Sequence, residues 1–465
     1  MALCIDYSTL DKEDKKILKN KLIVKPLKSQ YNPNPVPKHC YDIVSQETQE
    51  TQETQKSQDS DCIYIPIHCW KDICKEFPYD KTDFDSSKMK FKVKLFTRES
   101  DPMKRGRDQD IVFKEAVSKL TNDHVCFIAA FTGFGKTCLG TCLASHFKLK
   151  SAIICHNDII KEQWKESFEE FTTAKVQIIK GNVKFDKNAD VYIIGIQKAT
   201  SIPRENLENI GTVIIDEAHI CTETAFTSSL LRFTPMYLIG FSATPDRKDG
   251  LHKLLYNYFG PLKGFICRTE TKNFTVVKYK TEYRPKINYR MVLGKMTLDW
   301  NLVMTSLAEN VSRHREIVKI VKNHPNEKII ILSTLQVQTK GIYDLLVSEG
   351  ESVEILIGNK RVWDKSKRVL VAGTKKGGVG LNDPNLTMLI MASSTKDVRQ
   401  FEGRIRTTDN IVYDLVDDNK ILEKHWNVRE DWYVNRGATI VYEGATVSET
   451  SNSGTINLPL ERFTF

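Results

Sequence analysis

Eight consecutive residues, Ala130 to Thr137 (AFTGFGKT), have the types and spacing that bind phosphate groups. They match the phosphate-loop pattern A/G-x-x-x-x-G-K-S/T. Gly133 and Gly135 let the backbone curl so that its N–H groups point inward, and the start of a helix adds a positive dipole end. Lys136 would place its charge on the β- and γ-phosphates, and the Thr137 hydroxyl could ligate Mg²⁺. The predicted ATP-binding loop comprises Ala130, Phe131, Thr132, Gly133, Phe134, Gly135, Lys136 and Thr137.

The residues around this loop supply the strand and the helix that the pattern requires. An apolar run, Val125 to Ala130, precedes the loop, and apolar residues at helical spacing follow it from Cys138 to Leu143. Upstream, Gln109 opens an amphipathic segment, and its amide could both donate to and accept from the edge of an adenine. A Gly-rich turn with a chance lysine is the alternative interpretation, which the acidic motif described next disfavours.

Two carboxylates follow a second apolar run, Thr212 to Ile215, at Asp216 and Glu217. Asp216 would hold Mg²⁺, directly or through water, and Glu217 would orient and deprotonate an attacking water. A surface acidic turn is the alternative. The position at the carboxyl end of a buried strand favours the site, because α/β sheets bind their ligands there.

A further strand, Tyr237 to Phe241, is expected to end in Ser242, Ala243 and Thr244. Two hydroxyls beside a strand end could sense the phosphate site and relay its state. We therefore predict a coupling group formed by Ala218, His219, Ser242, Ala243 and Thr244.

Composition indicates a folded protein of two or three domains. The chain has 465 residues, 40% of them hydrophobic and 27% charged, with a formal net charge of +9. The positive balance weakly favours an acidic polymer as partner. No apolar run approaches the ~20 residues that span a bilayer, and the N-terminus lacks a secretory apolar core. These features predict a soluble intracellular protein that is not secreted.

The order of predicted elements indicates an α/β fold. Short apolar runs alternate with helical patterns after the phosphate loop, as in parallel sheets with crossover helices. Residues 1–100 are expected to form a small accessory domain, with a polar repeat at 45–60 that cannot build a core and is predicted to be disordered. Met89 to Phe96 alternates basic and apolar residues, as a half-buried strand would.

At this point a family resemblance becomes visible. AFTGFGKT, DEAH at 216–219 and SATPDRKDG at 242–250 resemble motifs I, II and III of superfamily 2 helicases, and EQW at 162–164 resembles motif Ia. The combination is most similar to the xeroderma pigmentosum B-type, phage branch-migration and A18-type viral helicases. The resemblance covers roughly residues 104–420.

The second half of the chain carries the later motifs of that family. Lys328 to Thr334 resembles motif IV, residues 374–382 resemble motif V with Gly380 near ATP, and residues 400–406 resemble motif VI. The resemblance implies that Gln400, Arg404 and Arg406 act on ATP from the second lobe, with an arginine stabilising the transferring phosphoryl group. The family's last arginine position is Thr407 here, which leaves open which arginine is the finger. Asn157, Thr334 and Thr374 would contact nucleic-acid phosphates.

The resemblance implies two tandem RecA-like lobes with parallel sheets, preceded by the small N-terminal domain. The expected boundaries are 1–100, lobe 1 at 101–265, a connector at 266–324, lobe 2 at 325–420 and an extension at 421–465. ATP and Mg²⁺ are the expected cofactors, a monomer is the expected state, and the nucleus, or a viral factory or virion, is the expected place. The favoured function is a DNA helicase; a duplex translocase, an RNA helicase and a catalytically weak binding subunit remain alternatives.

Overall fold

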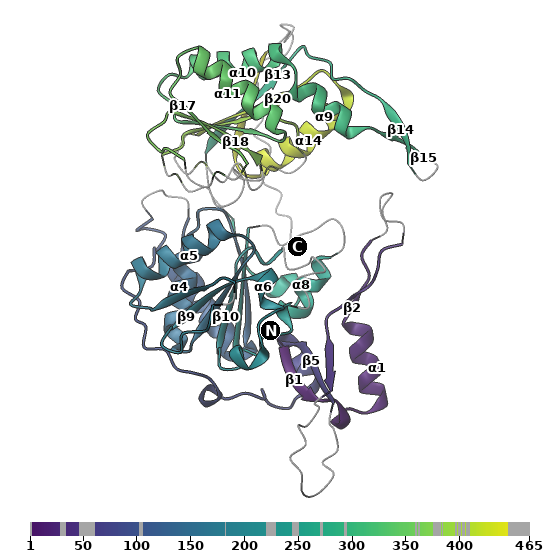
Figure 1. Ribbon diagram of the computed structural model, residues 1–465, viewed down its shortest axis with the longest axis vertical. Coiled ribbons are helices and arrows are strands. Elements are labelled where there is room, and N and C mark those ends of the chain that lie inside the picture. Colours follow the sequence, from purple (N-terminus) through teal and green to yellow (C-terminus); the bar gives the residue numbers. More distant parts are fainter. Residues whose placement is uncertain are drawn as a thin grey trace, which may run out of the picture. The chain divides into compact units, whose positions relative to one another are not determined.

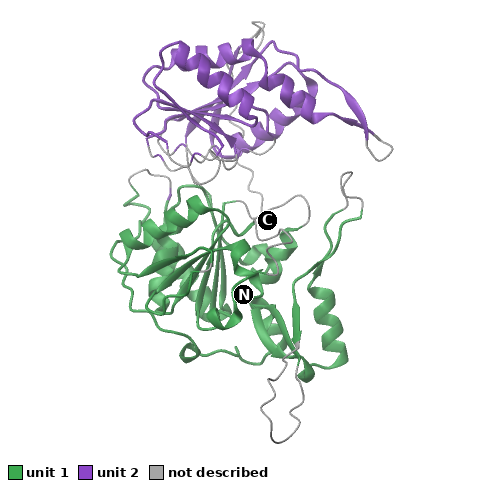
Figure 2. Cartoon of the chain, in the orientation of Figure 1, with its two compact units in different colours: residues 1–101, 107–269 green, residues 102–106, 270–465 purple. Residues whose placement is uncertain are grey.

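The computed structural model describes most of the chain as two compact units, residues 1–101 with 107–269 and residues 102–106 with 270–465 (Figure 2). The described residues are 2–27, 34–45, 61–101, 106–181, 183–219, 229–243, 251–269, 273–292, 295–358, 360, 363–374, 383, 385–395, 398, 401, 405 and 410–444. The predicted disordered repeat at 45–60 lies almost wholly outside them.

The first unit is built on a seven-stranded sheet in which every pairing is parallel. Its central strands are buried on both faces, as expected for β-branched runs covered by crossover helices. In spatial order the strands are β12 (Ile266–Arg268), β6 (Val125–Ala130), β11 (Tyr237–Ser242), β10 (Thr212–Ile215), β7 (Ser151–Cys155), β9 (Val191–Gly195) and β8 (Val176–Ile179). The helices of this layer (Figure 1) are α3 (Gln109–Asp123), α4 (Lys136–Phe147), α5 (Asp158–Phe171), α6 (Ile196–Ala199) and α8 (His252–Phe259).

A small antiparallel sheet at the N-terminus shares its hydrophobic core with the large sheet. Leu3 and Ile65 belong to the same buried cluster as Phe127 and Val213, and the Ala2 N–H donates to the Phe233 carbonyl at 2.7 Å. The small layer consists of β1 (Ala2–Asp6), β5 (Asp61–Pro66) and β4 (Asp42–Ser45), with α1 (Lys12–Lys21), α2 (Trp70–Ile73) and the pair β2 (Ile23–Val24) and β3 (Lys38–His39).

One expectation for this region is wrong. Met89 to Phe96 forms no strand; its only ladder contact in the described chain is an isolated bridge from Phe91 to Thr172. The Lys92 N–H donates to the Phe171 carbonyl at 2.8 Å, so the segment runs along the end of α5 and joins no sheet. Met89 is buried and Phe91 half-buried, but Val93 is 37% exposed, so the alternation in the sequence is matched by burial only at the start of the segment.

The second unit repeats the parallel architecture with seven strands. Alternate residues point to two cores: Ile330 and Leu332 join Trp426 on one face, and Ile329 and Ile331 join Ile317 on the other. The spatial order is β17 (Val353–Leu356), β18 (Val369–Gly373), β16 (Ile329–Ser333), β19 (Met388–Met391), β20 (Asn410–Val416), β13 (Phe274–Lys280) and β21 (Ala438–Gly444). Its helices are α9 (Trp300–Ala308), α10 (Val311–Asn323), α11 (Gln336–Ser348) and α14 (Lys420–Asn435), and a separate hairpin pairs β14 (Tyr289–Val292) with β15 (Lys295–Leu298).

The segments expected to be a connector and an extension contribute strands to these sheets. In the connector, β12 pairs with β6 of the first sheet, and β13 pairs with β20 and β21 of the second. The extension supplies α14 and β21. The domain boundaries proposed from the sequence remain predictions, whereas the α/β class with two parallel sheets and a small N-terminal sheet is confirmed. No helix within the described ranges has both the length and the apolar character needed to cross a bilayer.

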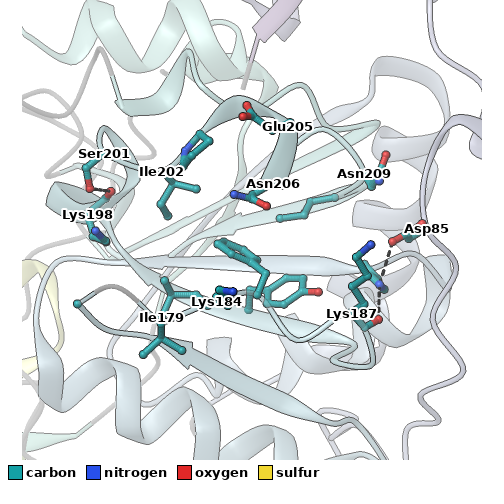
Figure 3. A pocket seen from close by; sticks show the side chains of 17 residues that line it. Asp85, Ile179, Lys184, Lys187, Lys198, Ser201, Ile202, Glu205, Asn206 and Asn209 are labelled. Carbon is teal, nitrogen blue, oxygen red and sulfur yellow. Dashed lines mark hydrogen bonds and ion pairs between the residues drawn. The ribbon is translucent and has the colours of Figure 1, made fainter.

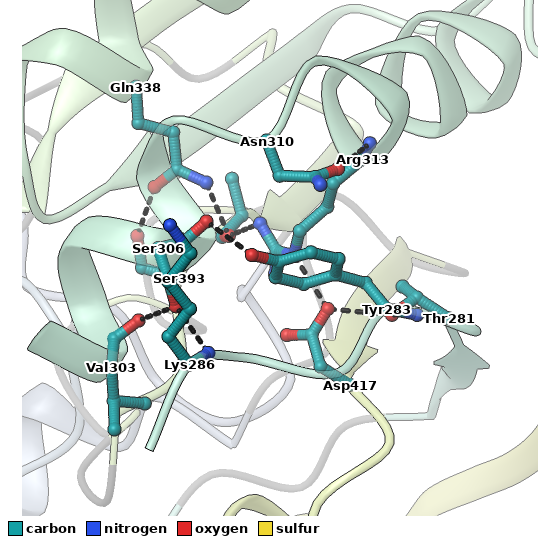
Figure 4. A network of polar contacts seen from close by, with 11 residues as sticks. Thr281, Tyr283, Lys286, Val303, Ser306, Asn310, Arg313, Gln338, Ser393 and Asp417 are labelled. Atoms are coloured by element: carbon teal, nitrogen blue, oxygen red, sulfur yellow. Dashed lines mark hydrogen bonds and ion pairs between the residues drawn. The ribbon is translucent and has the colours of Figure 1, made fainter. Parts of the chain in front are cut away.

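A buried ion pair lies at the carboxyl end of the second sheet (Figure 4). The Arg313 Nε donates to Asp417 Oδ1 at 2.7 Å, and both side chains have no exposed surface. Asp417 Oδ1 also accepts from the Thr281 hydroxyl at 2.6 Å, and Arg313 donates to the Ala392 carbonyl. This pair links α10 to the strand ends of β13, β19 and β20.

We predict that Asp417→Ala destabilises the protein by about 3–5 kcal/mol, because it leaves the Arg313 charge buried without its partner. The urea midpoint of the full chain measures this. Asp418→Ala is the matched control, since the neighbouring Asp418 pairs at 2.6 Å with Arg284, whose side chain is 83% exposed. It should leave the midpoint nearly unchanged; equal shifts in the two variants would contradict the prediction.

Candidate nucleotide site

The phosphate loop has the backbone shape that the sequence predicts. It leaves the fully buried strand β6, and Gly133 and Gly135 adopt φ values of 88° and 89° before α4 starts at Lys136. Side chains rarely adopt this left-handed conformation. A Cβ at Gly135 would also lie 2.2 Å from the Gln109 Nε2. Glycine is therefore required here twice over, and the curled loop at a helix N-terminus fits a phosphate ligand.

The side chains of the loop hold it in place. The Lys136 Nζ donates to the carbonyls of Ala130 at 3.0 Å and Phe131 at 3.3 Å, so the ammonium lies over the loop. Phe131 and Phe134 are buried, with their rings edge to face at 5.4 Å. Thr137 is half-buried in the first turn of α4, and Thr132 is half-buried within the loop.

Gln109 lies directly against this loop. It is 1% exposed; its Nε2 donates to the Phe134 carbonyl at 2.7 Å, and its Oε1 accepts from the Phe96 N–H at 3.0 Å. The amide thus joins the start of α3 to the loop. Its second N–H and second lone pair could still reach a base, so adenine reading remains a prediction for this residue.

Asp216 follows β10 and is held by two N–H donors. The Trp164 indole Nε1 donates to Oδ2 at 2.8 Å, and the Glu217 backbone N–H donates to Oδ1 at 2.9 Å. Burial and the nearby Glu217 charge raise the pKa of Asp216 to about 6, while the indole donor and Lys136 oppose the rise. A carboxylate kept ionised at the edge of a phosphate loop fits a magnesium ligand.

The residues directly after Asp216 contact Ser242, which belongs to the predicted coupling group on β11. Glu217 has a φ of 51°, an uncommon left-handed conformation for a residue with a side chain. Its Oε2 lies 3.3 Å from the His219 Nδ1, which also lies 2.9 Å from the Ser242 Oγ. Ala218 is fully buried between them. The structure therefore brings Glu217, His219 and Ser242 together; Ala243 follows β11, and Thr244 lies outside the described residues.

Strand pairing explains why these residues meet. In the parallel register Ser242 pairs with Ala129, and Ile215 pairs with Gly240 and with Ile154. The phosphate loop, the two carboxylates and Ser242 therefore lie at the carboxyl ends of the neighbouring strands β6, β10 and β11, at one edge of the sheet.

Two neighbours of the site were not assigned a role from the sequence. Trp164 is 1% exposed and belongs to the EQW helix, and the fold turns it onto Asp216. His156 follows β7, and burial lowers its pKa while the Glu217 charge opposes the fall. The recognised EQW motif was the available signal for Trp164; nothing local marked His156.

The predicted nucleic-acid contacts lie at strand ends in both units. The Asn157 side chain caps α5 by accepting from the Ile160 N–H at 2.9 Å. Thr334 follows β16, and its N–H donates to the Ser393 Oγ at 2.9 Å, which in turn donates to Gln338. Thr374 follows β18. Gly380, Gln400, Arg404 and Arg406, like Thr244, lie outside the described part, so their roles stay predictions.

A cavity elsewhere in the first unit does not compete with this site. It has a volume of about 640 Å³ and lies between the β8–β9 connection and residues 198–210 (Figure 3). Among its lysines, Lys150 already pairs with Asp85 at 2.8 Å. Among its described lining residues there is neither a glycine loop nor a carboxylate pair at a strand end.

We predict that Trp164→Phe raises the Mg²⁺ concentration for half-maximal ATP hydrolysis. The lost N–H donor raises the pKa of Asp216 further above its usual range, so less carboxylate is ionised. A rise of one pKa unit from about 6 would lower the ionised fraction roughly fivefold at pH 6, and the effect would shrink toward pH 8.5, where the group is ionised in either protein. Steady-state hydrolysis at several Mg²⁺ concentrations measures it.

Trp426→Phe is the matched control, since its buried indole Nε1 donates to Glu430 at 3.1 Å in the other unit. It should leave the Mg²⁺ midpoint unchanged. An unchanged midpoint in Trp164→Phe at pH 6 would disprove the role of the indole.

The comparisons with known proteins agree with this geometry. Residues 102–247 match the family model described as "Type III restriction enzyme, res subunit". The chain is 32% identical over 418 residues to "Putative helicase 161L" of Invertebrate iridescent virus 6, covering 82% of this chain and 90% of that protein. It is 23% identical to "DNA 3'-5' translocase XPB2" of Sulfurisphaera tokodaii, covering 63% of this chain and 76% of that protein.

The fold also matches a solved structure. A variant of S. cerevisiae Dbp5 bound to RNA and ADP BeF3 superposes with a TM-score of 0.51 at 15% identity, covering 71% of this chain and 89% of the other. This likeness supports the RecA-like character of the two lobes. Taken with the extensive identity to the iridoviral protein, these findings show that the chain belongs to the superfamily 2 helicases.

Proposed function

We propose that the protein is an ATP-driven DNA helicase that moves 3′ to 5′ and separates strands, in viral transcription or replication. The observation that carries the proposal is the meeting of the phosphate loop, Asp216, Glu217 and the His219–Ser242 contact at one sheet edge. A second parallel lobe that carries motifs IV to VI in its sequence adds to it.

Each residue of the edge has a role in this proposal. Lys136 and the loop N–H groups bind the phosphates, and Thr137 and Asp216 would hold Mg²⁺, which supplies charge neutralisation on the phosphate oxygens. Glu217 accepts a proton from the attacking water. Trp164 orients Asp216, and His219 links Glu217 to Ser242, so that a change at the phosphate end can reach β11. Gln400, Arg404 and Arg406 are proposed to act on ATP from the second lobe.

DNA is favoured over RNA on two grounds. The helicases with the most similar motif set are DNA-directed, and one relative is named as a DNA 3'-5' translocase. The net charge of +9 suits either polymer. Asn157, Thr334 and Thr374 are proposed to contact phosphates, which position a strand without reading its sequence. The protein is proposed to act as a monomer and to work with transcription or replication proteins.

Strand displacement tests the proposal. We expect the wild type to release a strand from a 3′-tailed DNA duplex in the presence of ATP and Mg²⁺. The Lys136→Ala variant should release the strand at least ~100-fold more slowly, because the loop then has no lysine to contact the phosphates. A 5′-tailed duplex and a tailed RNA duplex are the matched substrates. Equal displacement by wild type and variant would refute the helicase function.

Glu217→Gln should bind ATP as tightly as wild type while its hydrolysis falls by ~100-fold or more, since the amide cannot accept the water's proton. Filter binding and phosphate release measure the two effects separately. Wild-type turnover in this variant would remove Glu217 from the role of base.

A translocase that moves on duplex without separating strands is the second candidate. It is favoured if nucleic acid stimulates ATP hydrolysis and the protein displaces a triplex strand, while tailed duplexes remain intact. Basal ATP hydrolysis absent from the wild type would instead favour a binding subunit.

A further inference from the structure

The hairpin formed by β14 (Tyr289–Val292) and β15 (Lys295–Leu298) stands away from the helices and sheet of the second unit (Figure 1). It belongs to neither seven-stranded sheet. Its root is anchored, because Leu298 packs against the cluster of Val303, Met304 and Leu307. A two-stranded ribbon has little stability of its own, so the anchored root must hold it.

The antiparallel register gives this ribbon two different faces. Tyr289 pairs with Leu298 and Met291 pairs with Met296, so these four side chains share one face. Arg290 and Thr297 pair on the opposite face. One side of the ribbon is thus wholly apolar or aromatic, and the other carries a basic residue.

Apart from Leu298, the apolar face is open to solvent. Tyr289 is 51% exposed, Met291 65% and Met296 64%. Three large side chains grouped on one exposed strand face are unusual for a surface and mark a binding site more often than a chance feature. Unlike the exposed Val347 of α11, they form a continuous stripe in a segment that no fold requirement explains.

Charge near the ribbon indicates what covers this face. Lys286 and Arg290 are exposed and make no ion pair with any residue in the described ranges. Asp299, the first carboxylate after the ribbon in the sequence, is occupied as the cap of α9, accepting from the Leu302 N–H at 3.3 Å. A ribbon with an apolar and aromatic face, and with unpaired positive charge before it and on its opposite face, complements a partner with flat apolar groups on an anionic backbone. A single nucleic-acid strand has that chemistry.

We propose that the Tyr289, Met291 and Met296 face is a stacking surface for unpaired bases, with Lys286 and Arg290 attracting the backbone of the same strand. The inference rests on the proposed function and adds the element that contacts bases, since Asn157, Thr334 and Thr374 contact only phosphates in that proposal. Stacking is tolerant of sequence, because every base has a flat face. A second copy of this chain or a protein partner is the competing occupant of the same face.

A strand without bases tests the proposal, because it distinguishes binding to bases from binding to phosphates. The triple variant Tyr289→Thr, Met291→Thr, Met296→Thr keeps strand-forming residues while removing the apolar surface. Its affinity for a thymidine 20-mer, measured by fluorescence anisotropy with the full chain, should fall about tenfold or more. Its affinity for an abasic 20-mer of the same backbone length should equal that of wild type. Tyr289→Phe should retain wild-type affinity for both strands.

Arg290→Thr is the matched control on the opposite face. This variant should lower the affinity for the thymidine strand and for the abasic strand by the same factor. It should also reduce the salt dependence of binding, because it removes a phosphate contact. If the triple variant loses affinity equally for the two strands, or loses affinity for neither, the stacking role is overturned. A halved particle mass for the triple variant in light scattering assigns the face to a second copy and also overturns it.

The proposed function and this inference fail differently. If the wild type binds neither strand, the helicase function falls and the stacking surface falls with it. If the wild type binds the thymidine and abasic strands equally, nucleic-acid binding stands and only the stacking surface is lost.

Discussion

The half-buried carboxylate of Asp216, together with the groups that keep it ionised, is the interaction around which the phosphate-loop edge of the first unit is arranged. Burial and Glu217 raise the pKa of Asp216, and the fold answers with two N–H donors. The indole of Trp164 can reach Asp216 only because Gly140 leaves room: a Cβ there would lie 2.6 Å from the Trp164 ring and 3.0 Å from Phe241. The packing of α4 against α5 therefore places the indole donor that contacts Asp216.

The same edge carries the contacts among Glu217, His219 and Ser242. Glu217 is held in a left-handed backbone conformation, and such strain persists only where the surroundings impose it. The His219 ring contacts both the Glu217 carboxylate and the Ser242 hydroxyl at the end of β11. A small shift of Glu217 would therefore be felt one strand away, which is what a coupling element needs.

In the second unit, a chain of hydrogen bonds between neutral groups fixes the strand end that carries Thr334. The Thr334 N–H is held by Ser393, whose hydroxyl is held by Gln338, whose amide donates to the Ala392 carbonyl that Arg313 also contacts. This chain of bonds runs from a predicted phosphate contact to the buried pair of Arg313 and Asp417. A rigid strand end suits a contact that positions a backbone, whereas the exposed β14–β15 ribbon suits an adaptable contact with bases.

The sequence by itself determined the phosphate loop, the carboxylate pair and the alternation that makes two parallel sheets. These signals are local: glycine spacing, an apolar run and the polar residues directly after it lie within a few positions of one another. Only the tertiary structure decided that Trp164 holds Asp216, since 52 residues separate them. It also decided that β12 and β13 join different sheets, that β21 pairs with β13, and that Met89 to Phe96 is not a strand. Strand partners and side-chain contacts between residues so far apart in the sequence depend on the packing of the whole unit. A short stretch of sequence carries no information about that packing.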